Sequence, residues 1–139
     1  MTACPLCEPD AENVLWRDAR CRVILVDDAE YAGFCRVIWH AHVKEMTDLE
    51  PADRSHLFAV VLAVEAQLRE LLRPTKINLA SLGNQVPHLH WHVIPRFADD
   101  AHFPDPVWVP RKRKTPPRDV DVFRLAQGLA MKLPVLSTE

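Results

Sequence analysis

Three histidines alternate with large apolar residues in the run His88-Leu89-His90-Trp91-His92. Successive side chains of an extended strand point to opposite faces, so this spacing places the three imidazoles on one face. Leu89 and Trp91 then point the other way, into the core. An imidazole that titrates near neutral pH can serve as a base, a nucleophile or a metal ligand. The run is therefore the strongest candidate for chemistry in the chain.

A metal site made of all three histidines is one interpretation of this pattern. Residues i and i+4 of a strand lie roughly 13 Å apart, whereas metal–nitrogen bonds are about 2.0–2.1 Å long. His88 and His92 are therefore expected to do different jobs on either side of His90. A metal-dependent enzyme with the triad as ligands stays an alternative, which loss of activity on chelation would support.

The four cysteines fall into two groups. Cys4 and Cys7 form a Cys-x-x-Cys pair, which in a reducing compartment favours metal binding or redox chemistry over a structural disulfide. The alternative is a pair of exposed thiols. Cys21 and Cys35 fall within predicted strands and are expected to be small buried residues.

The strands and helices that would position these side chains can be predicted from the spacing of apolar residues and from the positions of prolines. Strands are predicted at residues 14–18, 21–26, 33–39, 76–82 and 89–94, with Pro95 ending the last. An apolar stripe at three- and four-residue spacing predicts a helix from Pro51 to Arg73, which Pro74 ends. A proline-rich arm and a helix near 118–132 follow. Strands, one long helix and strands again predict an α+β fold with an antiparallel sheet.

The bulk properties exclude several classes of protein. The 139 residues suit one domain. A formal net charge of −2 gives no global attraction to nucleic acid or an anionic membrane. No apolar run is long enough to span a bilayer, and no signal peptide is recognisable, so a cytoplasmic protein is expected. The basic run at 111–114 is interpreted as a solvated loop, with closure over a phosphate tail, together with Trp108, as the alternative.

The triad resembles the signature of the histidine-triad (HIT) family, His-φ-His-φ-His-φ-φ with φ apolar. Residues 88–94 fit it at all seven positions. The resemblance extends over about residues 4–97 and is strongest to small bacterial HIT proteins, often described as diadenosine polyphosphate hydrolases or nucleoside phosphoramidases. It implies one HIT domain over 1–139, with a sheet of about five strands, one long helix and a C-terminal helix. Residues 98–139 carry little of the family pattern.

The resemblance also implies roles for individual residues. His90 would attack the α-phosphate of a nucleotide and form a covalent nucleotidyl-histidine intermediate. The carbonyl of His88 would orient His90, and His92 would contact the α-phosphate and the leaving group. Asn84 and Gln85 occupy positions where relatives place polar residues near the phosphate.

A further set of residues would hold the nucleoside. Asp27 is similar in position to the residue that binds the ribose hydroxyls, and Val26 and Ile24 would wall the base pocket. Two departures from the family stand out. Phe34 replaces a histidine that supports the nucleophile in many relatives, and residues 39–42 replace a frequent proline-lysine-x-histidine.

Some HIT proteins and their uridylyltransferase relatives bind zinc through a similar Cys-x-x-Cys and two histidines. The matching positions here are Cys4, Cys7, His42 and His88, a suitable set for a structural zinc ion. The nucleophile itself would need no cofactor. The resemblance also implies a homodimer formed through the long helix and an edge strand.

The sequence therefore predicts a nucleotide hydrolase or nucleotidyl transferase that acts on a small-molecule substrate. A nucleoside phosphoramidate, a dinucleoside polyphosphate and an adenylylated metabolite all stay open, since they share the α-phosphate. The alternative from another class is a nucleotide-binding regulatory module with negligible turnover, a reading that Phe34 keeps open.

Overall fold

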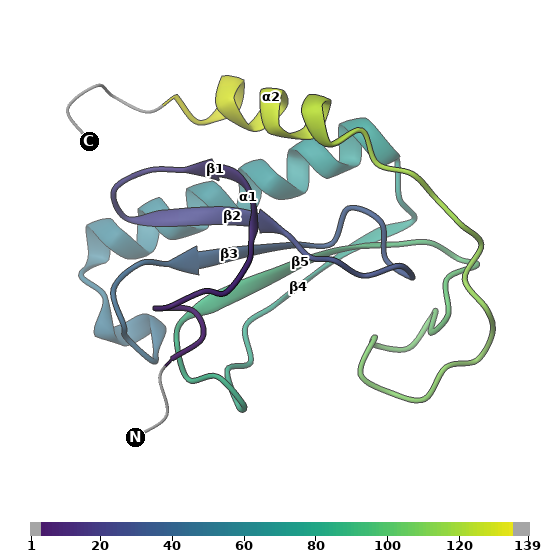
Figure 1. Ribbon diagram of the computed structural model, residues 1–139, viewed down its shortest axis with the longest axis horizontal. Coiled ribbons are helices and arrows are strands. Elements are labelled where there is room, and N and C mark those ends of the chain that lie inside the picture. The colour runs from purple at the N-terminus through teal and green to yellow at the C-terminus, as the bar shows by residue number, and fades with distance from the viewer. Residues whose placement is uncertain (1–3, 135–139) are drawn as a thin grey trace.

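The computed structural model describes residues 4–134, which form an antiparallel sheet and two α-helices (Figure 1). The strands are β1 (Asn13–Arg17), β2 (Cys21–Leu25), β3 (Cys35–Trp39), β4 (Lys76–Ala80) and β5 (His90–Arg96), and their order in the sheet is β1-β2-β3-β5-β4. The helices are α1 (Pro51–Leu72) and α2 (Val122–Lys132), and a 3-10 turn, η1, spans Met46–Asp48. The predicted α+β class, five-stranded sheet and two helices are confirmed.

Both helices pack on the same face of the sheet. Val23, Val37 and Val93 project from β2, β3 and β5 into one apolar cluster, which also contains buried leucines and valines of α1 and α2. Because side chains alternate along a strand, His90 and His92 project to the opposite face, which no helix of the described chain covers. The helices therefore build the core and leave the triad face free. Neither described helix is long and apolar enough to cross a membrane.

Residues at the helix termini account for where the helices begin and end. Pro51 occupies the first turn of α1, and Arg73 ends the helix in the left-handed conformation at φ 50°, just before Pro74. The second helix begins at Val122, four residues later than predicted. There the Asp121 side chain accepts a hydrogen bond from the backbone N–H of Arg124 at 3.0 Å.

Strand β5 differs from the prediction at both ends. It begins at His90, so His88 and Leu89 precede it, and it continues through Pro95 to Arg96. The prediction that Pro95 ends the strand is wrong. Pairing with β3 stops at Val93, and beyond it only β4 pairs with β5. Pro95 thus sits where one side of the strand is unpaired, a position that tolerates the missing N–H.

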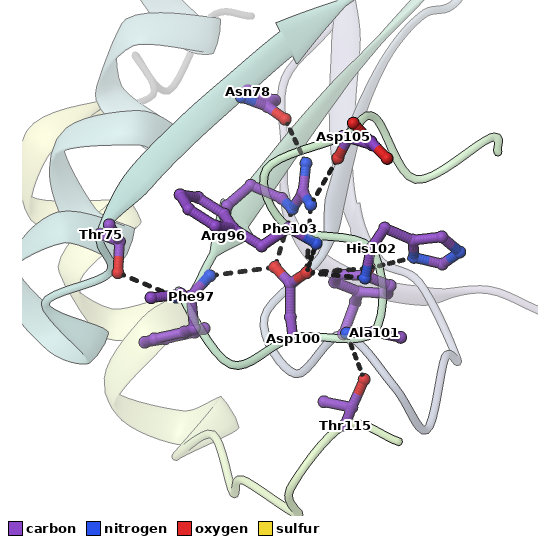
Figure 2. Close-up of polar contacts among 12 residues, drawn as sticks. Thr75, Asn78, Arg96, Phe97, Asp100, Ala101, His102, Phe103, Asp105 and Thr115 are labelled. Atoms are coloured by element: carbon purple, nitrogen blue, oxygen red, sulfur yellow. Dashed lines mark hydrogen bonds and ion pairs between the residues drawn. The ribbon is translucent and has the colours of Figure 1, made fainter. Parts of the chain in front are cut away.

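A buried ion pair holds the segment that follows β5 (Figure 2). Arg96 donates to both carboxylate oxygens of Asp100, at 2.8 and 3.1 Å, and both side chains are almost fully buried. The same carboxylate accepts hydrogen bonds from the backbone N–H groups of Phe97, His102 and Phe103. This network fixes the start of the arm that runs from the sheet toward α2.

Replacing Asp100 by Asn should lower the free energy of unfolding by about 3 kcal/mol, because it leaves the buried Arg96 charge uncompensated. Urea denaturation followed by circular dichroism measures the change. The matched control is Asp99→Asn, since Asp99 is half-exposed and pairs only with Arg118 among the described residues. That control should cost about 0.5 kcal/mol or less. Equal costs for the two variants would contradict the role assigned to Asp100.

The same pair predicts a dependence of stability on pH. Burial alone would raise the pKa of Asp100, but Arg96 and the three backbone N–H groups outweigh it and hold the pKa well below its usual value. A carboxyl group whose pKa is lower in the folded state stabilises fully above its unfolded pKa of about 3.9 and loses that contribution as pH falls. The difference in stability between the wild type and Asp100→Asn should therefore shrink between about pH 5 and pH 2.5. A constant difference would argue against it.

Candidate functional site

The middle histidine of the triad is held by a backbone carbonyl. His90 is buried at the start of β5, and its Nδ1 lies 2.6 Å from the carbonyl oxygen of His88. A carbonyl only accepts, so Nδ1 carries a proton, and in the neutral ring Nε2 keeps its lone pair. The His92 ring lies edge-on to His90, with 5.1 Å between ring centroids. The geometry thus fixes the tautomer of the neutral His90 ring beside a second imidazole.

His88 lies outside the strand and faces elsewhere. Its Nε2 donates to the carbonyl oxygen of Trp39 at 2.5 Å, which leaves Nδ1 as the unprotonated nitrogen. Burial, the main cause, lowers the pKa of His88 and favours the neutral ring. The prediction that all three imidazoles share one strand face is therefore wrong for His88, because β5 begins only at His90. The two outer histidines have different surroundings.

The Nδ1 atom of His88 belongs to a cluster of two thiols and two imidazoles. It lies 3.3 Å from Cys4 Sγ, 3.4 Å from Cys7 Sγ and 3.2 Å from His42 Nδ1. Cys7 Sγ also lies 3.3 Å from His42 Nδ1. All four ligand atoms lie within 4.8 Å of one another. The four residues predicted from the resemblance are thus brought together.

This donor set fits a four-coordinate metal ion. With bonds of about 2.3 Å to sulfur and about 2.0–2.1 Å to nitrogen, a tetrahedron has ligand–ligand separations of about 3.3–3.8 Å. The four separations just given, 3.2–3.4 Å, are close to that range. The contact between His88 Nε2 and Trp39 fixes the tautomer that coordination through Nδ1 requires. Cys4, Cys7, His42 and His88 could therefore hold a metal.

A cavity of about 580 Å³ opens over the triad face. Its polar and aromatic lining residues are Arg36, Asn84, Gln85, His90, His92 and Trp108. Asn84 and Gln85 follow Gly83, whose φ of 69° suits a residue without a side chain. The loop predicted to lie near the phosphate thus shares a cavity with the candidate nucleophile.

Arg36 is a residue of this cavity that the sequence analysis missed. It lies directly opposite His92 in the pairing of β3 with β5, and its Nε donates to His92 Nδ1 at 3.4 Å. Burial, followed by the neighbouring His90 and Arg36, lowers the pKa of His92 to about 4. His92 is therefore neutral at pH 7 and carries its proton on Nε2.

The residues predicted to hold the nucleoside line a different cavity. Ile24, Val26 and Asp27 border a cavity of about 820 Å³ at the end of β2, and none of the triad histidines lines it. The two cavities are neighbours, because Ile24 lies opposite Arg36 in the pairing of β2 with β3. The structure thus separates the predicted phosphate residues from the predicted nucleoside residues, and Arg36 lines the cavity of the phosphate residues.

The Phe34 side chain, at the position where the resemblance implies a histidine in many relatives, is buried. Its ring lies edge-on to His92, with 5.7 Å between centroids, and 5.8 Å from the Arg36 guanidinium carbon. On the arm, Trp108 is 55% exposed and its ring lies 6.5 Å from His92. The basic run 111–114 lines a separate hollow. Three of its four residues contact other parts of the protein. Arg111 pairs with Glu30, Lys112 pairs with Asp105, and Arg113 donates to two backbone carbonyls.

Comparison with known proteins identifies the class. Residues 9–99 match the HIT domain family, which covers more than half of the chain. The protein therefore belongs to the HIT domain family, as its triad predicted. No curated protein matches its sequence significantly.

Solved structures agree with this assignment. A histidine triad protein from Bradyrhizobium japonicum is 27% identical over 87% of this chain and 91% of its own, with a TM-score of 0.70. A second, from Sinorhizobium meliloti, is 29% identical over 88% and 90%, with a TM-score of 0.69. A Zn-bound histidine triad family protein from Mycobacterium smegmatis is 23% identical over 94% and 90%, with a TM-score of 0.60, and shares the fold.

Proposed function

We propose that the protein is a nucleotide hydrolase or nucleotidyl transferase that acts at the α-phosphate of a nucleotide conjugate through a covalent intermediate on His90. The observation that carries the proposal is the contact between His90 Nδ1 and the His88 carbonyl. In the neutral ring this contact keeps the lone pair on Nε2, in a cavity lined by His92, Asn84 and Gln85. A neutral imidazole in that state is a competent nucleophile toward phosphorus.

The proposed reaction has two steps. In the first, His90 Nε2 forms a bond to the α-phosphorus, the bond from phosphorus to the leaving group breaks, and its electron pair stays on the leaving group. The leaving group takes up a proton from water. In the second, water attacks phosphorus, the N–P bond breaks, and a nucleoside monophosphate is released. The His88 carbonyl stabilises the positive charge that His90 carries in between, because it accepts the Nδ1 proton.

The substrate would span both cavities. Asn84 and Gln85 would donate to the phosphate from the cavity of His90. Asp27 would accept from the ribose hydroxyls, and Ile24 and Val26 would contact the base. Dinucleoside polyphosphates and nucleoside phosphoramidates both fit this division, since the chemistry involves only their shared α-phosphate.

His90→Ala should abolish turnover, with a loss of about a thousandfold or more, because the attacking atom is gone. AMP released from an adenosine phosphoramidate and from diadenosine tetraphosphate is measured, and quenched protein is weighed intact by mass spectrometry. The wild type should show an AMP-sized adduct that His90→Ala lacks. The control is His56→Ala, a histidine of α1 that contacts Asp18 and does not line the triad cavity.

A nucleotide-binding module is the competing function, and the same experiment separates the two. If the wild type binds AMP but shows neither turnover nor adduct, the catalytic proposal fails and the binding module replaces it. An adduct that persists in His90→Ala would move the nucleophile to another residue.

We further propose that Cys4, Cys7, His42 and His88 bind a structural zinc ion. The donor set and its separations support this, and the Zn-bound relative from Mycobacterium smegmatis has the same fold. Zinc there would cross-link the N-terminal segment to His88 and supply no chemistry to the reaction. The loop between the two cysteines also carries Leu6, which lines the triad cavity.

Protein purified without chelator should contain one zinc ion per chain. Cys7→Ser should lose most of it, and chelation should lower the melting temperature of the wild type, because the ion stabilises only the folded state. Metal content is measured by mass spectrometry and melting by calorimetry. Cys35→Ala is the control, since Cys35 is buried in the core and outside the cluster. Folded wild type without zinc would sink the proposal.

We also propose a homodimer through α1 and the edge strand β4. Phe58 and Leu62 on α1 are 42% and 52% exposed, and Leu79 on β4 is 38% exposed, an unusual set for a surface facing only water. Light scattering should give a dimer for the wild type and a monomer for Leu62→Glu. Met131→Glu, at an exposed position of α2, should stay dimeric. A monomeric wild type would refute the proposal.

A further inference from the structure

Arg36 extends from the middle of β3 into the triad cavity. Its neighbours across the sheet are His92 on β5 and Ile24 on β2. The Nε atom donates to His92 Nδ1, and the Phe34 ring packs 5.8 Å from the guanidinium carbon. These contacts involve the Nε atom of the guanidinium and the side of the group that faces the Phe34 ring. They leave its two terminal nitrogens for another partner.

No carboxylate balances this charge in the part of the chain that the structure describes. None of the ion pairs among residues 4–134 includes Arg36, and none of the residues that line the cavity is acidic. The side chain is half-buried, and burial lowers the pKa of Arg36 without bringing an arginine near neutrality. A partly desolvated cation without a counter-ion is costly in a folded protein, and an anionic ligand offsets that cost.

Arg36 is also the permanent charge of this cavity. His92, which could have supplied positive charge, is neutral at pH 7 for the reasons given above. Of the remaining polar lining groups, the Asn84 and Gln85 amides carry no net charge, and His90 is the proposed nucleophile, which reacts as the neutral ring. Any phosphate group that enters the cavity therefore meets the full positive charge of Arg36.

We infer that Arg36 binds the α-phosphate of the substrate and neutralises part of its charge while His90 attacks. This inference rests on the proposed function and names the residue that recognises the phosphate. The planar guanidinium can place two N–H groups on two phosphate oxygens, a geometry that lysine lacks. Arg36 lines the triad cavity and lies opposite Ile24, which lines the other cavity. This position suits the α-phosphate, which joins the nucleoside to the leaving group.

The test compares binding of AMP and of adenosine, which differ only in the phosphate. Calorimetric titration of the wild type, Arg36→Gln and Arg36→Lys gives dissociation constants for both. Loss of a charge-assisted contact should weaken AMP binding by about 10- to 100-fold in Arg36→Gln, while adenosine binding stays within about twofold. Arg36→Lys keeps the charge and should recover part of the loss. Arg124→Gln, the same change at an exposed position of α2, is the control.

Each other outcome overturns a stated part. Unchanged AMP binding in Arg36→Gln removes Arg36 from phosphate recognition and leaves the proposed function intact. Equal losses for AMP and adenosine, in variants that melt like the wild type, assign Arg36 to the nucleoside and also overturn the inference. Arg36-dependent AMP binding without a covalent adduct supports the inference and refutes the catalytic proposal. A wild type that does not bind AMP refutes both.

Discussion

The position of His88 is the constraint on which the site depends. Its Nε2 is committed to the carbonyl oxygen of Trp39, its Nδ1 to the cluster of Cys4, Cys7 and His42, and its carbonyl oxygen to His90. One residue therefore connects the end of β3, the N-terminal segment and the candidate nucleophile. Because each of the three contacts uses a different atom, none competes with another. A shift of this backbone would change the tautomer and orientation of His90 together, so the cluster and the nucleophile are parts of one structure.

One face of the sheet carries the hydrophobic core, and the other carries the candidate functional site. Alternate residues of β3 and β5 send Val37, Trp91 and Val93 toward the helices and Arg36 and His92 to the other face. The arm after β5 approaches that second face, and the buried Arg96–Asp100 pair fixes where it starts. Trp108 thereby reaches the cavity although it is distant from the triad in the sequence. The open face is polar where the substrate is proposed to bind, and elsewhere it is closed by a small apolar cluster that contains Phe34 and Ile94.

Most of the fold could be predicted because the relevant signals are local. Period-two alternation predicts β5, and the apolar stripe with its flanking prolines predicts α1. The meeting of Cys4 and Cys7 with His42 and His88 could be expected only through the family resemblance, since a contact between residues 84 positions apart has no local signal. Pro95 was misjudged because its tolerance depends on where the neighbouring strand ends. Arg36 was missed because a lone arginine in an apolar strand resembles any exposed charge until its cross-strand partner is known.

Phe34 stands at a position where the family resemblance implies a histidine. The resemblance also implies that this histidine supports the nucleophile in many relatives, and its absence keeps open a protein that binds without turnover. In this chain the Phe34 ring packs against both His92 and Arg36. Phe34 immediately precedes β3, and Arg36 lies one position inside it. Since Arg36 contacts both Phe34 and His92, it offers a positive charge in the neighbourhood where the imidazole is missing. Arginine stays charged at any physiological pH, whereas His92 beside it is neutral. Phe34 therefore does not by itself decide between the binding module and the proposed catalysis, because Arg36 supplies a charge next to it.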